Sequence, residues 1–447
     1  MTRRSVVGPF ILIVLGLLFL LNNVKPDLKI FSEMARYWPF LLIAWGALRL
    51  VEVLVLAVSG RPLPSRGLSG GEIFLIILIC LFGSTLYSLD RWLPRVRLGP
   101  RSMEIFGESY DYPISVQKAL PAHARITLDN QRGNVRITGG DLPEIKISGR
   151  KTVLAYNKTD ADQTNEQSPI EVSVEGANVV IRTNQERVPE SRRISAELEI
   201  TVPRSAALVA RTRSGDYDID QLDGGVEIAS DRSEVRLSKI GGNVRVDTRS
   251  SGIIRAVDVK GEVMLTGRGN NIELENITGA VNVNGSYSGN LEFKNFAKAF
   301  HFESRNTDLK VVRVPGRISM DLGSFSALNV VGPIRMTSKS KDVKFEEFTD
   351  SLELDLERGD LELRPVKGPL GRIDAKIRNS GNIDLTVPAA AKFDLTGSTD
   401  RGEIRNEFGD VLAVETFGRS AKIRGKVGQG PLITLSTARG TVTTRKE

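Results

Sequence analysis

The sequence predicts a membrane-anchored, all-β protein with three N-terminal transmembrane helices followed by a single-stranded β-solenoid of about 18 residues per rung. Three apolar runs occupy the first hundred residues, and short strands of alternating apolar residues repeat through most of the remainder. The chain also contains 42 glycines and only 6% aromatic residues, which favours many tight turns. Because 447 residues exceed one ordinary domain, we expect a transmembrane region over 1–101 and a solenoid over 102–447.

The apolar runs lie near residues 6–22, 38–59 and 73–89. A helix rises about 1.5 Å per residue, so about 20 residues cross the hydrocarbon layer of a membrane. The second run reaches that length and the other two lie near its lower limit. A cleaved signal peptide is disfavoured for the first run, because no small-residue cleavage site follows it and two more apolar runs do. Three membrane spans are therefore predicted.

The second run contains Arg49 and Glu52, three positions apart and so on one face of a helix. A charge at membrane depth is costly, which makes this pair a candidate functional site. Two interpretations stay open: an internal ion pair or side chains extending to the interface, and a polar contact with another membrane protein. We predict no catalytic, cofactor-binding or metal-binding residues elsewhere in the chain.

The net charge of +7 is concentrated at the N-terminus. Residues 1–101 carry 12 basic and 5 acidic residues, which leaves 49 of each sign for residues 102–447. A neutral, aromatic-poor array does not indicate a nucleic-acid partner. The excess of arginines instead concerns membrane topology. Read literally, the positive-inside rule would put the C-terminal domain in the cytoplasm.

Two segments of the N-terminal region carry a resemblance to a known family. Gly16-Leu17-Leu18-Phe19-Leu20-Leu21-Asn22-Asn23, followed by Tyr37-Trp38-Pro39-Phe40-Leu41-Leu42-Ile43-Ala44-Trp45-Gly46, resembles the LiaI/LiaF-like transmembrane region of bacterial envelope proteins. The resemblance covers roughly residues 5–55. It implies a membrane-organising or envelope-stress context rather than a chemistry.

The C-terminal region repeats itself. Apolar-x-apolar pairs recur at spacings of 18, 19, 18, 19, 18, 16 and 18 residues, and a second pair follows about nine residues after most of them. The pairs begin at Val226, Val244, Val263, Val281, Phe300, Ile318, Ile334 and Leu352. One such unit cannot bury its own apolar face, so we expect the units to stack as parallel rungs about 4.8 Å apart.

Residues 150–195 interrupt this pattern with many charged and amide residues, and we expect a surface excursion there. Alternating apolar residues over Val172–Val174 and Val179–Ile181 predict a hairpin inside it.

A second signature is glycine, one polar residue, then an apolar-x-apolar pair, as in Ser214-Gly215-Asp216-Tyr217-Asp218-Ile219. Together with Asn382-Ile383-Asp384-Leu385-Thr386-Val387-Pro388 and the ending Gly430-Pro431-Leu432-Ile433-Thr434-Leu435, it resembles the bacterial putative-adhesin β-solenoid family. The resemblance runs over roughly residues 120–445. It implies a usually exported surface domain of unknown biochemical activity, with no family catalytic residues to carry over.

Several short motifs are explained by the repeat. Arg358-Gly359-Asp360 spells an integrin-binding tripeptide but occupies an ordinary turn position. Gly241-Gly242-Asn243-Val244 begins like a calcium-binding nonapeptide whose period then fails. One cysteine and two histidines, His123 and His301, do not make a thiolate or multi-histidine metal centre.

The function expected from the sequence is that of a non-enzymatic, membrane-anchored envelope protein whose solenoid is a scaffold or binding surface. Its partners would be the membrane and envelope polysaccharide or other envelope proteins, with no cofactor and no small-molecule substrate identified. We expect it in a bacterial cytoplasmic membrane with the solenoid outside the cytoplasm.

Two alternatives stay open. One is a carbohydrate-active enzyme that uses charged residues of an exposed strand face, such as Asp247, Glu273, Asp321, Lys344 and Asp355. The other is a sensor or scaffold that faces the cytoplasm, as the charge count indicates.

Overall fold

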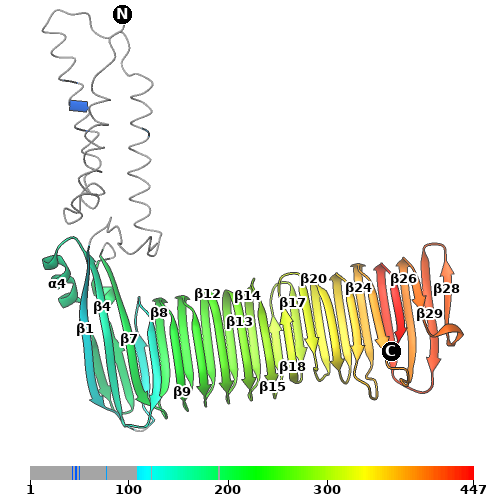
Figure 1. Cartoon of the computed structure of the whole chain (residues 1–447), viewed down its shortest axis with the longest axis horizontal. Helices are drawn as coiled ribbons and strands as arrows, with labels where there is room; N and C mark the ends of the chain where they lie inside the picture. Colours follow the sequence, from blue (N-terminus) through cyan, green and yellow to red (C-terminus); the bar gives the residue numbers. More distant parts are fainter. Residues whose placement is uncertain are drawn as a thin grey trace, which may run out of the picture. The chain divides into compact units, whose positions relative to one another are not determined.

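The computed structural model describes residues 108–447, apart from 122, 190 and 191, and five separate positions nearer the N-terminus (Figure 1). Those five positions are all helical: Ile43, Gly46, Ala47, Leu50 and Ile77. The predicted membrane spans otherwise fall outside the described residues. Within the part that is described, no helix combines the length and the apolar character needed to cross a bilayer. The chain divides into two units, and the second, Asp111–Thr152 with Asn165–Glu447, contains nearly all of the strands, here called the β-array.

The β-array consists of two rows of strands, and each regular rung contributes one strand to each row (Figure 1). The long strands β12 and β13 make this visible, because the first half of β12 pairs with β10 and its second half pairs with β11. Strands of the first row, in spatial order, are β5 (Glu171–Glu175), β6 (Asn178–Arg182), β2 (Arg125–Asp129), β8 (Ala207–Ser214), β10 (Val226–Arg232), the first halves of β12 (Val244–Val259) and β13 (Val263–Ile277), β14 (Val281–Tyr287), β16 (Phe300–Glu303), β17 (Thr307–Val311), β20 (Ile334–Ser340), β22 (Leu352–Arg358), β24 (Ile373–Ser380), β30 (Leu432–Arg439), β26 (Phe393–Arg401), β29 (Ser420–Val427) and β28 (Leu412–Phe417).

Strands of the second row, in the same spatial order, are β1 (Glu108–Ala119), β4 (Glu144–Ala155), β7 (Arg193–Pro203), β3 (Val135–Gly140), β9 (Tyr217–Leu222), β11 (Val235–Ile240), the second halves of β12 and β13, β15 (Leu291–Phe296), β18 (Val314–Met320), β19 (Ser324–Leu328), β21 (Asp342–Phe348), β23 (Leu361–Pro365), β25 (Ile383–Val387), β31 (Val442–Lys446) and β27 (Ile404–Asn406). The described helices are α4 (Lys158–Gln167) and two single turns of 3-10 helix, η2 (Gln185–Arg187) and η3 (Gly409–Val411).

The rung length predicted from the sequence is confirmed in the middle of the β-array. Val226 lies opposite Val244, Val244 opposite Val263, and Val263 opposite Val281, all in parallel register. Each step is therefore 18 or 19 residues. Parallel stacking satisfies the backbone groups of each rung with those of its neighbours.

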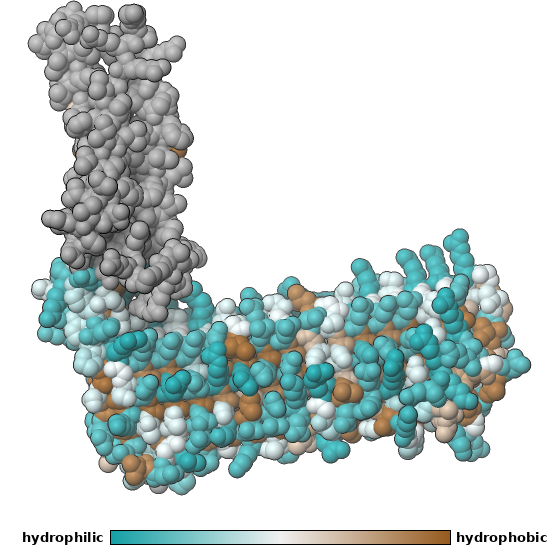
Figure 2. Space-filling view, viewed as in Figure 1, coloured by the Kyte–Doolittle hydropathy of each residue, from teal (hydrophilic) through white to brown (hydrophobic). Residues whose placement is uncertain are grey.

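The alternation of side chains places the apolar residues between the two rows. Val226 and Ile228 of β10 are 2% and 0% exposed, and the polar residues between them face outward. The face of the β-array seen in Figure 2 is mostly hydrophilic, with apolar groups showing in narrow rows. A further apolar residue, just after the second-row strand pair, is buried as well, because the residue before it adopts a left-handed conformation that turns the chain inward. Lys239 (φ 55°) thus precedes Ile240, which is fully buried.

Glycines stack where the chain turns from the first row to the second. Gly381 has φ +155°, and a Cβ atom built on it would lie 2.0 Å from the carbonyl oxygen of Gly359 in the neighbouring rung. A Cβ on Gly440 would lie 2.1 Å from the carbonyl oxygen of Gly381. No side chain fits at that separation, so the rungs can approach closely only where these positions are glycine.

The polar residue after each of these glycines links one rung to the next. The Asp342 carboxylate accepts a hydrogen bond from the Asp360 amide (2.9 Å), and that of Asp360 accepts one from the Asn382 amide (2.8 Å). The Asn382 side-chain oxygen accepts one from the Thr441 amide (2.9 Å). The glycine-plus-polar signature is thus a ladder of side-chain caps on backbone N–H groups.

The β-array is not parallel throughout, and here the prediction from the sequence is wrong. Phe300, Ile318 and Ile334 do not begin three successive parallel rungs. β16 pairs antiparallel with β17, and β18 pairs antiparallel with both β15 and β19. Ile318 lies opposite Phe293, in the reversed direction. Parallel pairing returns between β19 and β21 and between β20 and β22.

Two tight turns cause this reversal. The Ser304 amide donates to the Thr307 carbonyl (2.8 Å) in the turn between β16 and β17. The Asp321 carboxylate accepts the amides of Gly323 (2.8 Å) and Ser324 (2.7 Å) between β18 and β19, and these bonds lower the pKa of Asp321. Apolar alternation has the same period in either strand direction, so the spacing of apolar pairs could not reveal the reversal.

Aromatic residues fill the core beside the reversed strands. Phe293, Phe296, Phe300 and Phe302 are at most 3% exposed, and the ring centroid of Phe293 lies 4.6 to 6.3 Å from those of the other three. Tilted and edge-on ring contacts at these distances add to the stabilisation from buried apolar area.

The C-terminal strands return into the β-array instead of extending it. β30 pairs with both β24 and β26, and β31 pairs with both β25 and β27. The chain therefore ends inside the row, and β28 and β29 form the last strands of the first row (Figure 1).

The segment predicted as an excursion contains both expected and unexpected structure. The predicted hairpin is present, because Val172 lies opposite Ile181 in an antiparallel pair of β5 and β6. β6 also pairs with β2, so the hairpin belongs to the first row. The helix α4 was not predicted from the sequence.

A buried lysine lies at the C-terminal end of α4. Lys151 is 4% exposed, and its Nζ donates to the carbonyl oxygens of Asn165 (2.9 Å) and Ser168. Carbonyl groups at a helix C-terminus carry partial negative charge, which suits an ammonium group. Burial nevertheless lowers the pKa of Lys151 to about 8, because the charged form loses its water.

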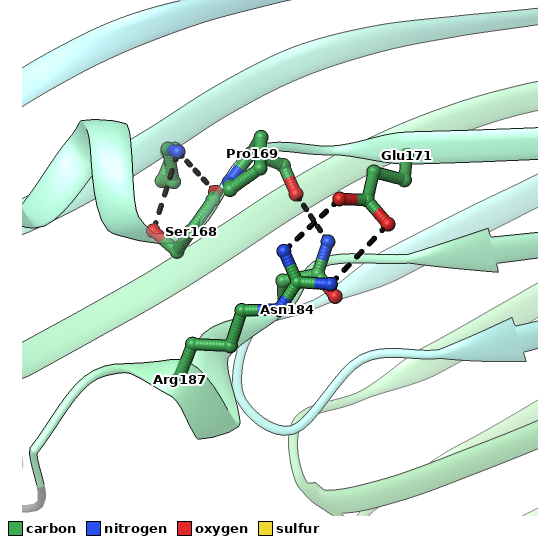
Figure 3. A network of polar contacts seen from close by, with 6 residues as sticks. Ser168, Pro169, Glu171, Asn184 and Arg187 are labelled. Carbon is green, nitrogen blue, oxygen red and sulfur yellow. Dashed lines mark hydrogen bonds and ion pairs between the residues drawn. The ribbon is translucent and has the colours of Figure 1, made fainter.

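Polar contacts continue from this lysine to the 3-10 turn η2 (Figure 3). Asn184 donates to the Pro169 carbonyl (2.8 Å), and the Arg187 guanidinium binds both carboxylate oxygens of Glu171 (3.0 and 3.5 Å). Hydrogen bonds from Arg187, then from Asn184, lower the pKa of Glu171. Gln185 extends the network by bonding both backbone groups of Arg132 with its side-chain amide.

We expect the variant Gly381→Ala to lower the free energy of unfolding by more than about 2 kcal/mol, because its Cβ meets the Gly359 carbonyl and its φ is unfavourable for alanine. The measurement is denaturant unfolding of the full chain in detergent. Gly323→Ala is the matched control, because the nearest atom to its Cβ is 3.9 Å away, and it should change the free energy by less than about 0.5 kcal/mol. Equal effects of the two variants would contradict the close-approach argument.

The buried Lys151 predicts a pH dependence. Below pH about 8 its side chain is protonated in both states, whereas between about 8 and its ordinary pKa of 10.5 the unfolded chain binds more protons. The free energy of unfolding of the wild type, relative to Lys151→Met, should therefore rise with pH in that window. Unfolding curves of both proteins at pH 7, 9 and 10 measure this difference, and a difference that stays constant contradicts the prediction.

Candidate functional site

The polar pair predicted in the second span, Arg49 and Glu52, lies outside the described residues, and its role stays a prediction. In the part of the chain that the structure describes, no group of three or more His, Cys, Asp or Glu side chains could hold a metal ion.

The five outward-facing charged residues singled out in the sequence are not brought together. Asp247 on β12 and Asp355 on β22 belong to the first row, and Glu273 on β13 and Lys344 on β21 belong to the second. Asp321 lies in the turn between β18 and β19. No pair of carboxylates at catalytic spacing emerges from this set.

Two of these residues, Glu273 and Lys344, instead pair with the residue directly opposite on a neighbouring rung, as Glu353 also does. Glu273 lies opposite Arg255 at 3.4 Å, and Glu353 lies opposite Arg335 at 2.7 Å. Lys344 contacts both Glu346 (3.0 Å) and Glu362 (3.6 Å). Exposed cross-strand ion pairs contribute only about 0.2–1 kcal/mol each. They pair opposite charges at these positions, whereas like charges lie opposite each other at others, as Glu273 and Glu292 do.

A hollow of about 590 Å³ lies in the first row beside the reversed strands. It forms because the turn between β16 and β17 replaces the continuous rung edge found elsewhere. Its lining consists of polar side chains of both charges: Ser304, Arg305, Asn306, Thr307, Asp308, Thr337, Ser338, Lys339, Asp355, Glu357, Arg378 and Asn379. Its volume lies within the range of small-ligand sites, although such sites are usually more apolar.

Two carboxylates of this hollow are held by basic partners. Arg378 binds both oxygens of Asp355, with Nε at 2.7 Å, and this contact raises the pKa of the Arg378 guanidinium. Asp308 lies 3.0 Å from Nε2 of His301, whose side chain is half-buried. The hollow therefore presents hydrogen-bond donors and acceptors of both signs, which is suited to a polyhydroxylated or peptide ligand.

A carboxyl group with a raised pKa lies elsewhere, on the second row. Burial raises the pKa of Asp384, although Arg445 lies 3.0 Å away and opposes this effect. Its Oδ1 is buried without a hydrogen-bond partner. Glu362, directly opposite in the next rung, raises the pKa further. Raised carboxyl pKa values also occur in general acids, so Asp384 is the group that most favours catalysis.

The tripeptide Arg358-Gly359-Asp360 has a structural role. Its Asp360 carboxylate accepts the Asn382 amide in the rung-to-rung ladder, and its Arg358 lies 3.9 Å from Glu357.

Sequence reasoning missed the hollow because it assumed parallel rungs throughout. The available signal was the polar run Ser304-Arg305-Asn306 between two apolar pairs, which is long enough for a hairpin turn.

Comparisons with known proteins agree with both resemblances seen in the sequence. Residues 7–92 match the family model of the LiaF transmembrane domain, and residues 123–443 match that of Toastrack DUF4097. No curated protein matches the chain.

Solved structures similar to the chain include two bacterial proteins. One is a putative cell adhesion protein from Clostridium sporogenes, with 9% identity, coverage of 75% of this chain and 100% of that chain, and a TM-score of 0.21. The other is a putative adhesin from Bacteroides fragilis, with 12% identity, coverage of 75% and 97%, and a TM-score of 0.26.

The N-terminal match gives the chain a membrane region, and the C-terminal match covers most of its length with the all-β, solenoid-like array described above. The protein belongs to the Toastrack DUF4097 family and carries a LiaF-type transmembrane domain at its N-terminus.

Proposed function

We propose that the protein is a non-enzymatic component of the bacterial cell envelope that presents its β-array as a scaffold or binding surface. Residues 1–101 would anchor it by three spans, and residues 102–447, with the excursion near 150–195, would form the presented domain. The LiaF-type membrane region supports this proposal. Arg49 and Glu52 would contact each other or another membrane protein.

One observation carries the proposal: several outward acidic residues of the β-array are paired with basic side chains of neighbouring strands. Glu273, Glu353 and Asp355 each bind a basic side chain on a neighbouring strand. A general acid or nucleophile needs a carboxyl group that is available to a substrate. The hollow in the first row is the recess best suited to a segment of envelope polysaccharide or of another envelope protein.

We place the β-array outside the cytoplasm, although the arginines that flank the predicted spans favour the opposite orientation. Long domains are translocated despite local charge, so the positive-inside rule is weak next to a domain of this length. A sensor or scaffold that faces the cytoplasm is the alternative that follows from the charge count.

A carbohydrate-active enzyme is the second candidate, and Asp384 is the observation in its favour. Incubation of the purified protein with a panel of envelope glycans and pectins tests it. Cleavage that is lost in Asp384→Asn, or in Asp355→Asn in the hollow, would establish catalysis. Asp247→Asn, on the first row and away from both sites, is the matched control.

Fusion of a reporter enzyme that is active only outside the cytoplasm, placed after Glu447, tests the orientation. We expect full reporter activity, because the chain after the third span would then be translocated. A cytoplasmic fluorescent reporter at the same position should be dark. An inactive enzyme fusion together with a bright fluorescent fusion would overturn the extracytoplasmic placement.

A further inference from the structure

The first row ends in a strand with one open edge. β28 pairs with β29 alone among the strands that the structure describes. In an antiparallel pair, alternate residues direct their N–H and C=O groups away from the partner. The free side of β28 therefore presents backbone groups without a partner strand, a template for another strand, although the Leu412 carbonyl already accepts a hydrogen bond from Nδ2 of Asn406 (2.9 Å).

The side chains around this edge are unusually apolar for the surface of the β-array. Val411, Val414 and Phe417 are 55%, 41% and 58% exposed, all within seven residues. The strand Leu412–Phe417 contains a single charge, Glu415. Apolar colour also shows at the end of the β-array that carries β28 (Figure 2).

The other terminal edges are protected against pairing. β5 begins and ends with Glu171 and Glu175, and β1 contains Pro113, which has no N–H to donate. β27 is only three residues long. Charge, proline and shortness are the usual means by which proteins prevent edge-to-edge association. β28 has none of them apart from Glu415.

We propose that β28 pairs antiparallel with β28 of a second copy of this chain, with Val414 on the two-fold axis. This register places Ala413 opposite Glu415, and Leu412 opposite Thr416, so that no like charges meet. Centring the pair on Glu415 instead would place two carboxylates face to face, which is destabilising. Self-complementarity about one residue is what a two-fold interface requires.

The pairing joins two β-arrays at their ends and continues both first rows as one sheet. The exposed side chain of Val414 then packs against Val414 of the second copy. Within its own chain, Val414 lies opposite the buried Ile423 of β29. One short strand pair buries less than the roughly 1,200 Å² of a stable interface, so the contact is weak in dilute solution. Anchoring in a shared membrane raises the effective concentration of the two copies.

Cysteine cross-linking in the native membrane tests this pairing. The sequence has one cysteine, Cys80, so the background is Cys80→Ser with Val414→Cys added. Opposed residues of an antiparallel pair have Cα atoms about 4.5–5.5 Å apart, which a disulfide spans. We expect oxidation to convert most of the protein into a covalent dimer.

Three matched variants accompany it. Ser173→Cys lies at an exposed position of β5, the opposite terminal edge of the same row, and should stay monomeric. Glu415→Cys should cross-link poorly with itself but well with Ala413→Cys in a mixed population, because those two positions face each other. More homodimer from Glu415→Cys than from Val414→Cys would overturn the register.

A monomeric Val414→Cys protein whose thiol still reacts with a maleimide would overturn the proposal. A disulfide between Val414→Cys and a different protein would overturn it as well, because the edge would then serve another partner. Because Val414 is exposed, its substitution should leave the fold intact, and unchanged thermal unfolding of the reduced protein checks this.

Discussion

The close stacking of one rung's backbone on the next is the constraint on which the rest of the β-array depends. Strands about 4.8 Å apart leave no space for a side chain that points along the array axis at the turns. Glycine at Gly359, Gly381 and Gly440 meets this requirement, because any Cβ there would overlap a carbonyl group of the adjacent rung. The polar residues that follow them then satisfy the amides of the neighbouring turn.

Surface chemistry follows from the same stacking. Once the rungs are in register, outward side chains of successive rungs form columns, and opposite charges that meet in a column can pair. The ion pair of Arg335 and Glu353 is one result of this register, although like charges also lie opposite each other, as Arg236 and Arg255 do. Acidic residues that resemble catalytic candidates in the sequence are therefore often structural in the fold. Asp384 differs because burial, rather than pairing, dominates its pKa.

Departures from regular stacking create the features most relevant to function. The hairpin between β16 and β17 interrupts the parallel rungs of the first row, and its turn forms one wall of the polar hollow. The return of β30 and β31 into the rows leaves β28 and β29 as the end of the first row, with an apolar open edge. The end of a solenoid exposes either a capping element or an open strand edge to which another strand can pair.

The sequence by itself determined the all-β repeat, its 18-to-19-residue rung, the buried positions such as Val226 and Ile240, and the hairpin at Val172–Ile181. These are local properties, set by apolar alternation and turn residues within a few positions of each other. Only the tertiary structure decided strand direction, the insertion of the last two strands, the helix α4 and the hollow. Strand direction depends on which distant segment a strand pairs with, and a period-two pattern reads the same in both directions.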